Sequence, residues 1–160
     1  MFEPGNILYG VFRLSNIETK PKYAIVLHKD DNSYILATFT TSQPRAGATV
    51  YIHGKNPPGS QNPKSHVFLA TRMIGTYTVQ GVSKEYHFPD DTTVVPDYGF
   101  RFTSITEFQK NVTNLVLKCT LYEKEYLDLI YTLYQCKKSP REYKEIYKQI
   151  LTERLKSSKG

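Results

Sequence analysis

Near its start the chain contains two apolar segments joined by a polar tetrapeptide: Lys22–His28 (KYAIVLH), Lys29-Asp30-Asp31-Asn32 and Tyr34–Thr41 (YILATFTT). The first and last segments are short runs rich in apolar and β-branched residues, and the tetrapeptide between them is a polar turn signal. Two such runs around a turn predict a β-hairpin.

Further short strands are expected on both sides of this hairpin, because apolar or β-branched segments alternate with turn residues. Several short strands separated by turns indicate a small β-barrel or a sandwich. The strand candidates are Asn6–Phe12, Val50–His53, His66–Ile74, Thr76–Val79 and Thr92–Val95.

The hydrophobic period changes after about residue 104. Ser104 and Glu107 can form a capping box over a helix near Ile105–Lys110, and Glu123–Gln135 places its apolar residues on one helical face. Asn114–Leu121 (NLVLKCTL) fits either a last strand or the start of a helix. We therefore expect an α+β fold, with a β-barrel domain at 1–104 and a helical extension at 105–160 packed on it as one globular unit.

The C-terminal segment carries a clear helix signal. Ser139-Pro140-Arg141-Glu142 supplies an N-cap, a first-turn proline and a reciprocal glutamate. Apolar residues then repeat at helical spacing from Tyr143 to Leu155. This amphipathic helix should pack on the preceding helix as a C-terminal helical hairpin, and the alternative is that it binds a partner chain.

Composition sets the broad class. The chain has 160 residues, 39% of them hydrophobic and 22% charged, with a net charge of +6, which are values of one globular domain. Cys119 and Cys136 have no metal-ligand spacing and are expected to be reduced and buried. The N-terminal residues lack a signal-peptide pattern and no apolar run reaches the roughly 18 residues of a membrane helix, so we expect a cytoplasmic protein with no membrane partner.

Residues 32–84 contain no Asp or Glu. A surface with charge of one sign suits a polyanion, although a β-rich segment also uses few carboxylates because Asp and Glu are poor strand formers. The Gly/Pro-rich loop Gly54–Ser65 lies within this segment and is either a flap over a groove or a plain connection. The basic residues and histidines of the whole segment 32–84 are Arg45, His53, Lys55, Lys64, His66, Arg72 and Lys84.

The sequence has no P-loop and no GxGxxG, HExxH or GxSxG motif, and its four histidines lack ligand spacing. We therefore expect neither a metal site nor a cofactor. Cleavage of RNA requires neither, because the 2′-OH of RNA is the nucleophile and side chains supply proton transfer and charge stabilisation. Suitable side chains between residues 22 and 72 are Lys22, Thr40, Thr41, Ser42, Arg45, His53, His66 and Arg72.

Three segments, Pro4–Phe12 (PGNILYGVF), Lys22–Asp30 (KYAIVLHKD) and Ile35–Ser42 (ILATFTTS), resemble consecutive strands of the MazF/PemK-like toxins in order and spacing. The resemblance covers roughly residues 4–45, and a weaker match continues through His66–Ile74. It implies a small SH3-like antiparallel β-barrel, a homodimer, an acidic antitoxin protein as partner, and metal-independent cleavage of single-stranded RNA.

The resemblance also assigns catalytic roles to positions of this sequence. Lys22 stands where the family has its catalytic Arg, and Thr40 matches its catalytic Thr. Lys22 lacks the planar fork of an Arg, and Leu69 and Thr71 stand where some members have a catalytic Arg and Asp. The RNA-binding candidates are Ser42, Arg45, His53, Lys55, Lys64, His66 and Arg72. The leading hypothesis is a toxin-like single-stranded RNA-binding protein with endoribonuclease activity; the alternative is a non-catalytic SH3-like adaptor that binds protein or nucleic acid.

Overall fold

The computed structural model describes residues 1–42 and 52–159 and has an α+β fold. It divides into two compact units that are interleaved along the chain, which differs from the expected division at residue 104. Unit 1 comprises Met1–Thr40, Gly75–Tyr86 and Tyr98–Tyr122, and unit 2 comprises Thr41–Ile74, His87–Asp97 and Glu123–Gly160.

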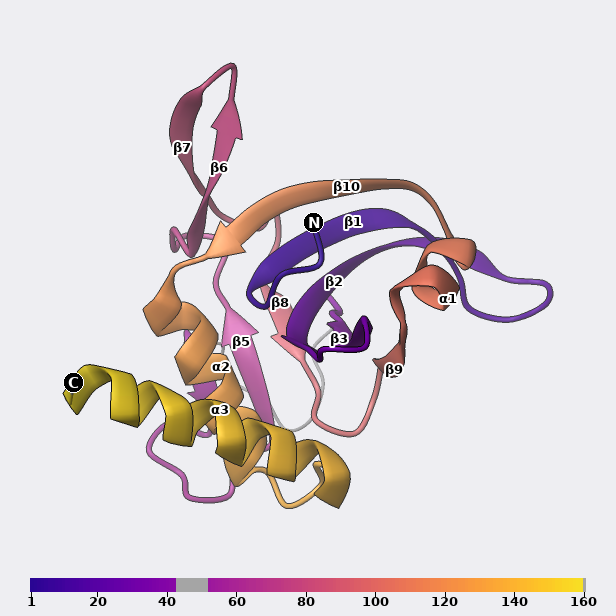
Figure 1. The fold of residues 1–160 in the computed structure, drawn as a ribbon. Helices are drawn as coiled ribbons and strands as arrows, with labels where there is room; N and C mark the ends of the chain where they lie inside the picture. The colour runs from indigo at the N-terminus through magenta and orange to yellow at the C-terminus, as the bar shows by residue number, and fades with distance from the viewer. Residues whose placement is uncertain (43–51, 160) are drawn as a thin grey trace. The chain divides into compact units, whose positions relative to one another are not determined.

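Unit 1 is built on a seven-stranded sheet in the order β7-β6-β10-β1-β2-β3-β9 (Figure 1). Each pair of neighbouring strands is antiparallel, and β7 and β9 are the two edges among the strands that the structure describes. The strands are β1 (Asn6–Arg13), β2 (Thr19–Lys29), β3 (Tyr34–Phe39), β6 (Gly75–Val79), β7 (Val82–Tyr86), β9 (Phe100–Ser104) and β10 (Val112–Leu121).

The predicted hairpin is confirmed as β2 and β3. Its turn is closed by Asp30, whose Oδ1 accepts hydrogen bonds from the backbone N–H groups of Asn32 at 2.8 Å and Tyr34 at 3.0 Å. Ser33 takes the left-handed conformation between them, with φ of 63°. The polar tetrapeptide therefore acts through an aspartate side chain that fixes the turn.

The ambiguous segment Asn114–Leu121 is part of strand β10. This strand lies between β1 and β6, and it pairs with β1 along most of its length. The apolar residues of this segment suit a strand and a helix equally well. The segment forms a strand because the backbone edges of β1 and β6 supply hydrogen-bond partners on both of its sides. The helical part of the C-terminal region thus begins only at Glu123.

The core of unit 1 lies on one face of its central strands. Apolar side chains at alternate positions of β1, β2 and β3 meet Phe108 of helix α1 (Ile105–Lys110), which is capped as predicted by Ser104. The ring centres of Phe12 and Phe108 lie 5.4 Å apart in an edge-to-face arrangement. The buried members of this cluster are Phe2, Leu8, Phe12, Ala24, Val26, Ile35, Ala37 and Phe108.

In its described residues, unit 2 combines a three-stranded antiparallel sheet with two helices. Its sheet has the order β4-β5-β8, formed by β4 (Gly54–Asn56), β5 (Ser65–Phe68) and β8 (Thr92–Val94). Helix α2 (Glu123–Gln135) contacts β4 and β5 and also packs against α3 (Arg141–Lys159).

The predicted packing of the last helix on the preceding one is confirmed. Tyr147, in the middle of the α3 stripe, is fully buried. Arg154, near the end of α3, forms an ion pair of 2.5 Å with Glu123 at the start of α2, so the two helices run antiparallel. Leu155, near the end of the stripe, is 62% exposed.

The predicted N-cap of α3 is wrong. The Ser139 hydroxyl donates to the carbonyl of Leu133 at 2.6 Å instead of capping the helix. The carbonyl of Pro140 accepts from the N–H groups of Tyr143 and Lys144 at 3.1 and 3.0 Å, which makes Pro140 the N-cap residue. Ser139 lies in the short connection between the helices, where its hydroxyl reaches the Leu133 carbonyl near the end of α2.

Cys119 and Cys136 are buried free thiols, as predicted. Over the ranges 1–42 and 52–159, the structure has no helix that combines the length and the apolar character required to cross a membrane.

Candidate functional site

The two catalytic candidates, Lys22 and Thr40, are close together in the backbone of unit 1. Lys22 lies in β2 opposite Gly10 and is partly exposed. Thr40 directly follows β3, and its N–H donates to the carbonyl of Tyr23 at 3.1 Å. The side chain of Thr40 is buried, with 7% of the residue exposed.

Strand alternation gives these two side chains different faces of the sheet. Lys22 shares a face with Ala24, and Ala24 is paired with Phe39 of β3. Thr40 follows Phe39 and therefore belongs to the opposite face, that of Tyr23. Lys22 and Thr40 consequently do not form a side-chain pair that holds one phosphate from one side of the sheet.

The described RNA-binding candidates all belong to unit 2, while Arg45 lies outside the described residues. The Nζ atom of Lys55 donates to Oε1 of Gln135 at 2.9 Å and lies 5.6 Å from the ring centre of Tyr131. The charge of Lys55 is thus held against α2. The exposed candidates are Ser42, Lys64 and Arg72.

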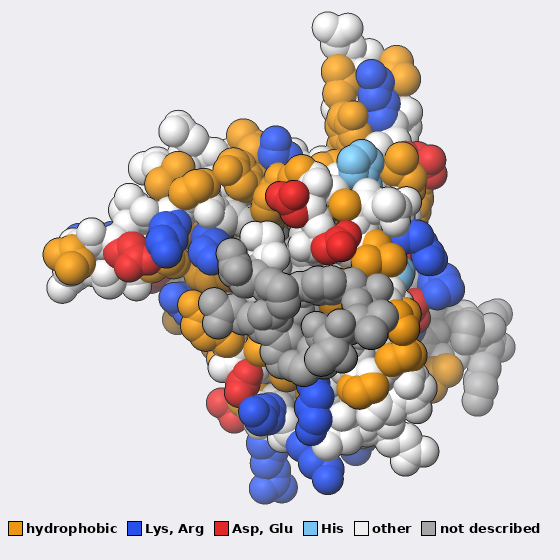
Figure 2. Space-filling model, turned by 180° about the vertical axis from the view of Figure 1, so that it is seen from behind, with side chains coloured by type: hydrophobic (Ala, Val, Ile, Leu, Met, Phe, Trp, Pro, Cys, Tyr) orange, Lys and Arg blue, Asp and Glu red, His pale blue; other side chains and the backbone are white. Residues whose placement is uncertain are grey.

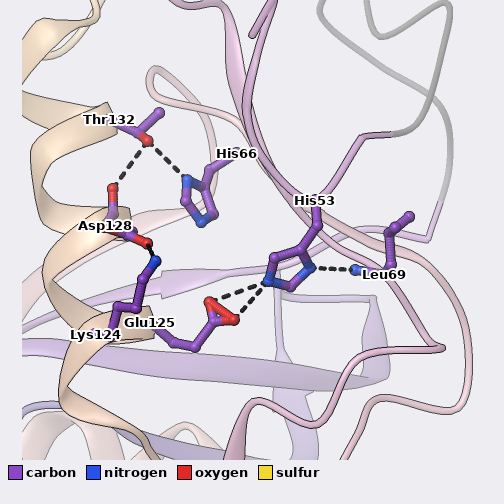
Figure 3. Close-up of polar contacts among 7 residues, drawn as sticks. All are labelled: His53, His66, Leu69, Lys124, Glu125, Asp128 and Thr132. Carbon is purple, nitrogen blue, oxygen red and sulfur yellow. Dashed lines mark hydrogen bonds and ion pairs between the residues drawn. The ribbon is translucent and has the colours of Figure 1, made fainter. Parts of the chain in front are cut away.

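His53 uses both ring nitrogens inside unit 2 (Figure 3). Its Nδ1 accepts a hydrogen bond from the N–H of Leu69 at 3.1 Å, so the proton of the neutral ring is on Nε2. Nε2 in turn lies 2.6 and 3.0 Å from the two carboxylate oxygens of Glu125. The His53 and Glu125 side chains are 9% and 12% exposed, so this pair fastens α2 to the segment before β4. His53 has no ring nitrogen left to exchange a proton with a substrate.

His66 is fully buried in β5 and points toward α2 (Figure 3). Its Nδ1 lies 2.7 Å from Oγ1 of Thr132, and that hydroxyl donates to the carbonyl of Asp128 at 2.9 Å. Thr132 therefore accepts from His66, which carries its proton on Nδ1. Burial lowers the pKa of His66 to about 3, so the ring is neutral at physiological pH. With no exposed surface, His66 offers no contact to RNA in this fold.

The thiols do not supply a nucleophile. Burial raises the pKa of Cys119 to about 12 and that of Cys136 to about 11, so both stay protonated near neutral pH. In the part of the chain that the structure describes, no three or more His, Cys, Asp or Glu side chains are grouped so that they could hold a metal ion.

A different group of side chains in unit 1 has the chemistry of a binding surface. Tyr9 of β1 and Tyr23 of β2 are directly opposite each other, with ring centres 4.6 Å apart. Nζ of Lys118 from β10 lies 5.5 Å from the ring centre of Tyr9. All three are partly exposed, and Val116, which pairs with Tyr9, is 44% exposed. We call Tyr9, Tyr23 and Lys118 the tyrosine–lysine surface.

The sequence alone does not locate the tyrosine–lysine surface. The chain contains 13 Tyr and no Trp, which shows a supply of amphipathic rings but not their location. Lys118 is more than 90 residues from Tyr9 and Tyr23 in the sequence, and only the pairing of β10 with β1 brings it to them. The outward position of Tyr9 in the predicted strand Asn6–Phe12 was the one available signal.

No protein-family model, curated protein or solved structure matches this chain. We therefore infer its function from the geometry and chemistry of its own residues.

Proposed function

We propose that this protein binds single-stranded RNA through the tyrosine–lysine surface. The main support for this proposal is that Tyr9 and Tyr23 present two partly exposed rings, with the ammonium group of Lys118 over the ring of Tyr9. Bases stack on aromatic side chains of this kind, and a neighbouring cation attracts the phosphate backbone. The net charge of +6 favours the same class of partner.

The toxin-like assignment is part of this proposal. The assignment rests on the resemblance of residues 4–45 to the MazF/PemK-like toxins. It implies an SH3-like barrel, a homodimer, an acidic antitoxin as partner and a cytoplasmic location. The antiparallel sheet of unit 1 supports the assignment as a coarse fold class, since β1, β2 and β3 follow one another as neighbouring strands.

The direct test is a titration of fluorescently labelled single-stranded RNA of about 12 nucleotides, with a duplex of the same sequence as the competitor. We expect saturable binding of the single strand that weakens as salt rises from about 50 to about 200 mM. Binding that is absent, or equally tight for the duplex, would contradict the proposal because stacking requires unpaired bases.

A second candidate function is metal-independent cleavage of the bound RNA. It rests on the resemblance of residues 4–45, which gives Lys22 of β2 the catalytic role; Thr40 lies on the other face of the sheet and takes no part in it. In such cleavage the 2′-OH loses its proton to water while its oxygen attacks the adjacent phosphorus, and the bond to the 5′-oxygen breaks as that oxygen takes a proton from water. A cation stabilises the charge of the phosphorane. The partial exposure of Lys22 lets it serve as that cation.

Incubation of RNA with the protein in EDTA tests this candidate. Cleavage should disappear in Lys22→Ala, and it should persist in Lys20→Ala, a matched control on the same strand and face. An RNA that binds but stays intact would reject cleavage and favour the non-catalytic SH3-like adaptor.

A further inference from the structure

The β6–β7 hairpin projects beyond the sheet of unit 1 (Figure 1). Within β6, Gly75 and Thr76 pair with β10, and the following residues pair only with β7. Gln80 and Gly81 form its tight turn, with φ values of 50° and 79°. Two consecutive positive φ values are typical of the type I′ turn that suits the twist of a two-stranded ribbon. We call Gly75–Tyr86 the hairpin arm.

The hairpin arm has two chemically different faces. The register pairs Tyr77 with Lys84 and Val79 with Val82, so alternation collects aromatic and apolar side chains on one face. Val79 and Val82 are 42% and 58% exposed, and Figure 2 shows apolar side chains along the projecting arm with a basic side chain among them. The aromatic face is formed by Tyr77, Val79, Val82, Lys84 and Tyr86, and the polar face by Thr76, Thr78, Ser83 and Glu85.

The charges of the arm are divided between these faces. Lys84 is exposed on the aromatic face. Glu85 is on the polar face, where its carboxylate accepts a hydrogen bond from the Tyr122 hydroxyl at 2.6 Å. All residues of the arm are described, and its aromatic face carries a positive charge without a carboxylate. This charge is complementary to a phosphate backbone.

The aromatic face is also continuous with the tyrosine–lysine surface. The rings of Tyr77 and Tyr86 lie 6.2 Å apart and nearly perpendicular, at 87°. The Tyr86 hydroxyl is buried beside Tyr23, and burial, followed by the charge and hydrogen bond of Tyr23, raises the pKa of Tyr86. Tyr23 therefore links the arm to Tyr9 and Lys118 on the sheet.

We propose that the aromatic face of the hairpin arm is a second contact for the same single-stranded RNA. Tyr77 offers a ring on which a base stacks, and Lys84 pairs with a phosphate. The inference rests on the proposed function, and it further states that the protein binds a longer RNA strand more tightly than a short one because the longer strand also contacts the arm. A strand of about four nucleotides can occupy the tyrosine–lysine surface alone, whereas one of about twelve nucleotides reaches the arm as well.

The experiment compares these two RNA lengths on variants of the arm. Tyr77→Leu keeps an apolar side chain against Tyr86 but removes the stacking ring. It should weaken binding of the longer RNA by about 5-fold or more and leave the shorter one unchanged. Lys84→Gln should lower the slope of log affinity against log salt by about 0.7 for the longer RNA. Thr78→Ala, on the polar face of the same arm, is the matched control.

Three results would overturn the inference, and they can be told apart. If Tyr77→Leu and Lys84→Gln bind both lengths like the wild type while Tyr9→Ala loses both, the proposed function stands and the arm is not a contact. If the wild type binds neither length, the proposed function itself fails. If Val82→Ser turns a dimer into a monomer in light scattering with RNA affinity unchanged, the arm docks a second copy of the chain instead.

Discussion

Nδ1 of His66 lies 2.7 Å from Oγ1 of Thr132, and this hydrogen bond defines His66 as a neutral structural residue. The Thr132 hydroxyl already donates to the carbonyl of Asp128, so His66 must donate. The other ring nitrogen, Nε2, is buried and accepts no hydrogen bond from the residues that the structure describes. Protonation of this nitrogen would place a charge in an interior that provides no acceptor for it.

The stability of the protein should therefore fall as pH falls below about 6.5. His66 titrates near 6.5 in the unfolded chain and at about 3 in the fold, so between these values the unfolded state binds more protons. The free energy of unfolding should decrease by about 1.4 kcal/mol per pH unit in this window and be insensitive to His66 above it. Urea unfolding at several pH values measures this slope.

The matched variants for this prediction are His66→Gln and His87→Gln. Gln can still donate to Thr132 but does not titrate, so the first variant should lose about 1.4 kcal/mol per pH unit of slope. His87 is exposed, and its replacement should leave the slope unchanged. An unaltered slope in His66→Gln would show that another group is responsible.

Loss of the Glu125 carboxylate should destabilise unit 2. Glu125→Ala leaves Nε2–H of His53 buried without its acceptor, which costs about 1–3 kcal/mol of unfolding free energy. Glu125→Gln retains an acceptor and should cost less. Glu145→Ala, an exposed position on α3, should stay within about 0.5 kcal/mol of the wild type. Thermal or urea unfolding measures all three.

RNA affinity gives a second readout for the Glu125 variants. Because the His53–Glu125 pair has a structural role, RNA affinity at a temperature where the variant is folded should match the wild type. A variant that keeps its stability but loses RNA binding would instead place Glu125 or His53 in the binding surface.

The sequence predicted those elements whose signals are local. The β2–β3 turn was predictable because Asp30 bonds residues two and four positions ahead, and the cap of α1 because Ser104 bonds Glu107. The roles of His53 and His66 depend on partners 72 and 66 residues away, so their sequence neighbourhood could not show that they are engaged or buried. For the same reason, the tyrosine–lysine surface could not be read before the register of β10 was known.

Gly75→Ala should weaken the attachment of the hairpin arm to the sheet. A Cβ atom at this position would lie 2.2 Å from the carbonyl oxygen of Thr120, a backbone atom of the paired strand β10. Forcing these strands apart should cost about 1–3 kcal/mol of unfolding free energy. Thr78→Ala, farther along the same strand and exposed, serves as the control. Equal stability of the two variants would contradict the close approach of β6 and β10.

RNA binding at the tyrosine–lysine surface is tested by comparing the RNA affinity of Tyr9→Ala with that of Tyr98→Ala. Tyr98 is 61% exposed in the same unit, outside the tyrosine–lysine surface and the hairpin arm, so it controls for the loss of any surface ring. We predict that Tyr9→Ala lowers the binding free energy for single-stranded RNA by about 1–3 kcal/mol, which is roughly 5-fold or more in affinity, and that Tyr98→Ala leaves it unchanged. Equal affinity of both folded variants and the wild type would contradict RNA binding at the tyrosine–lysine surface.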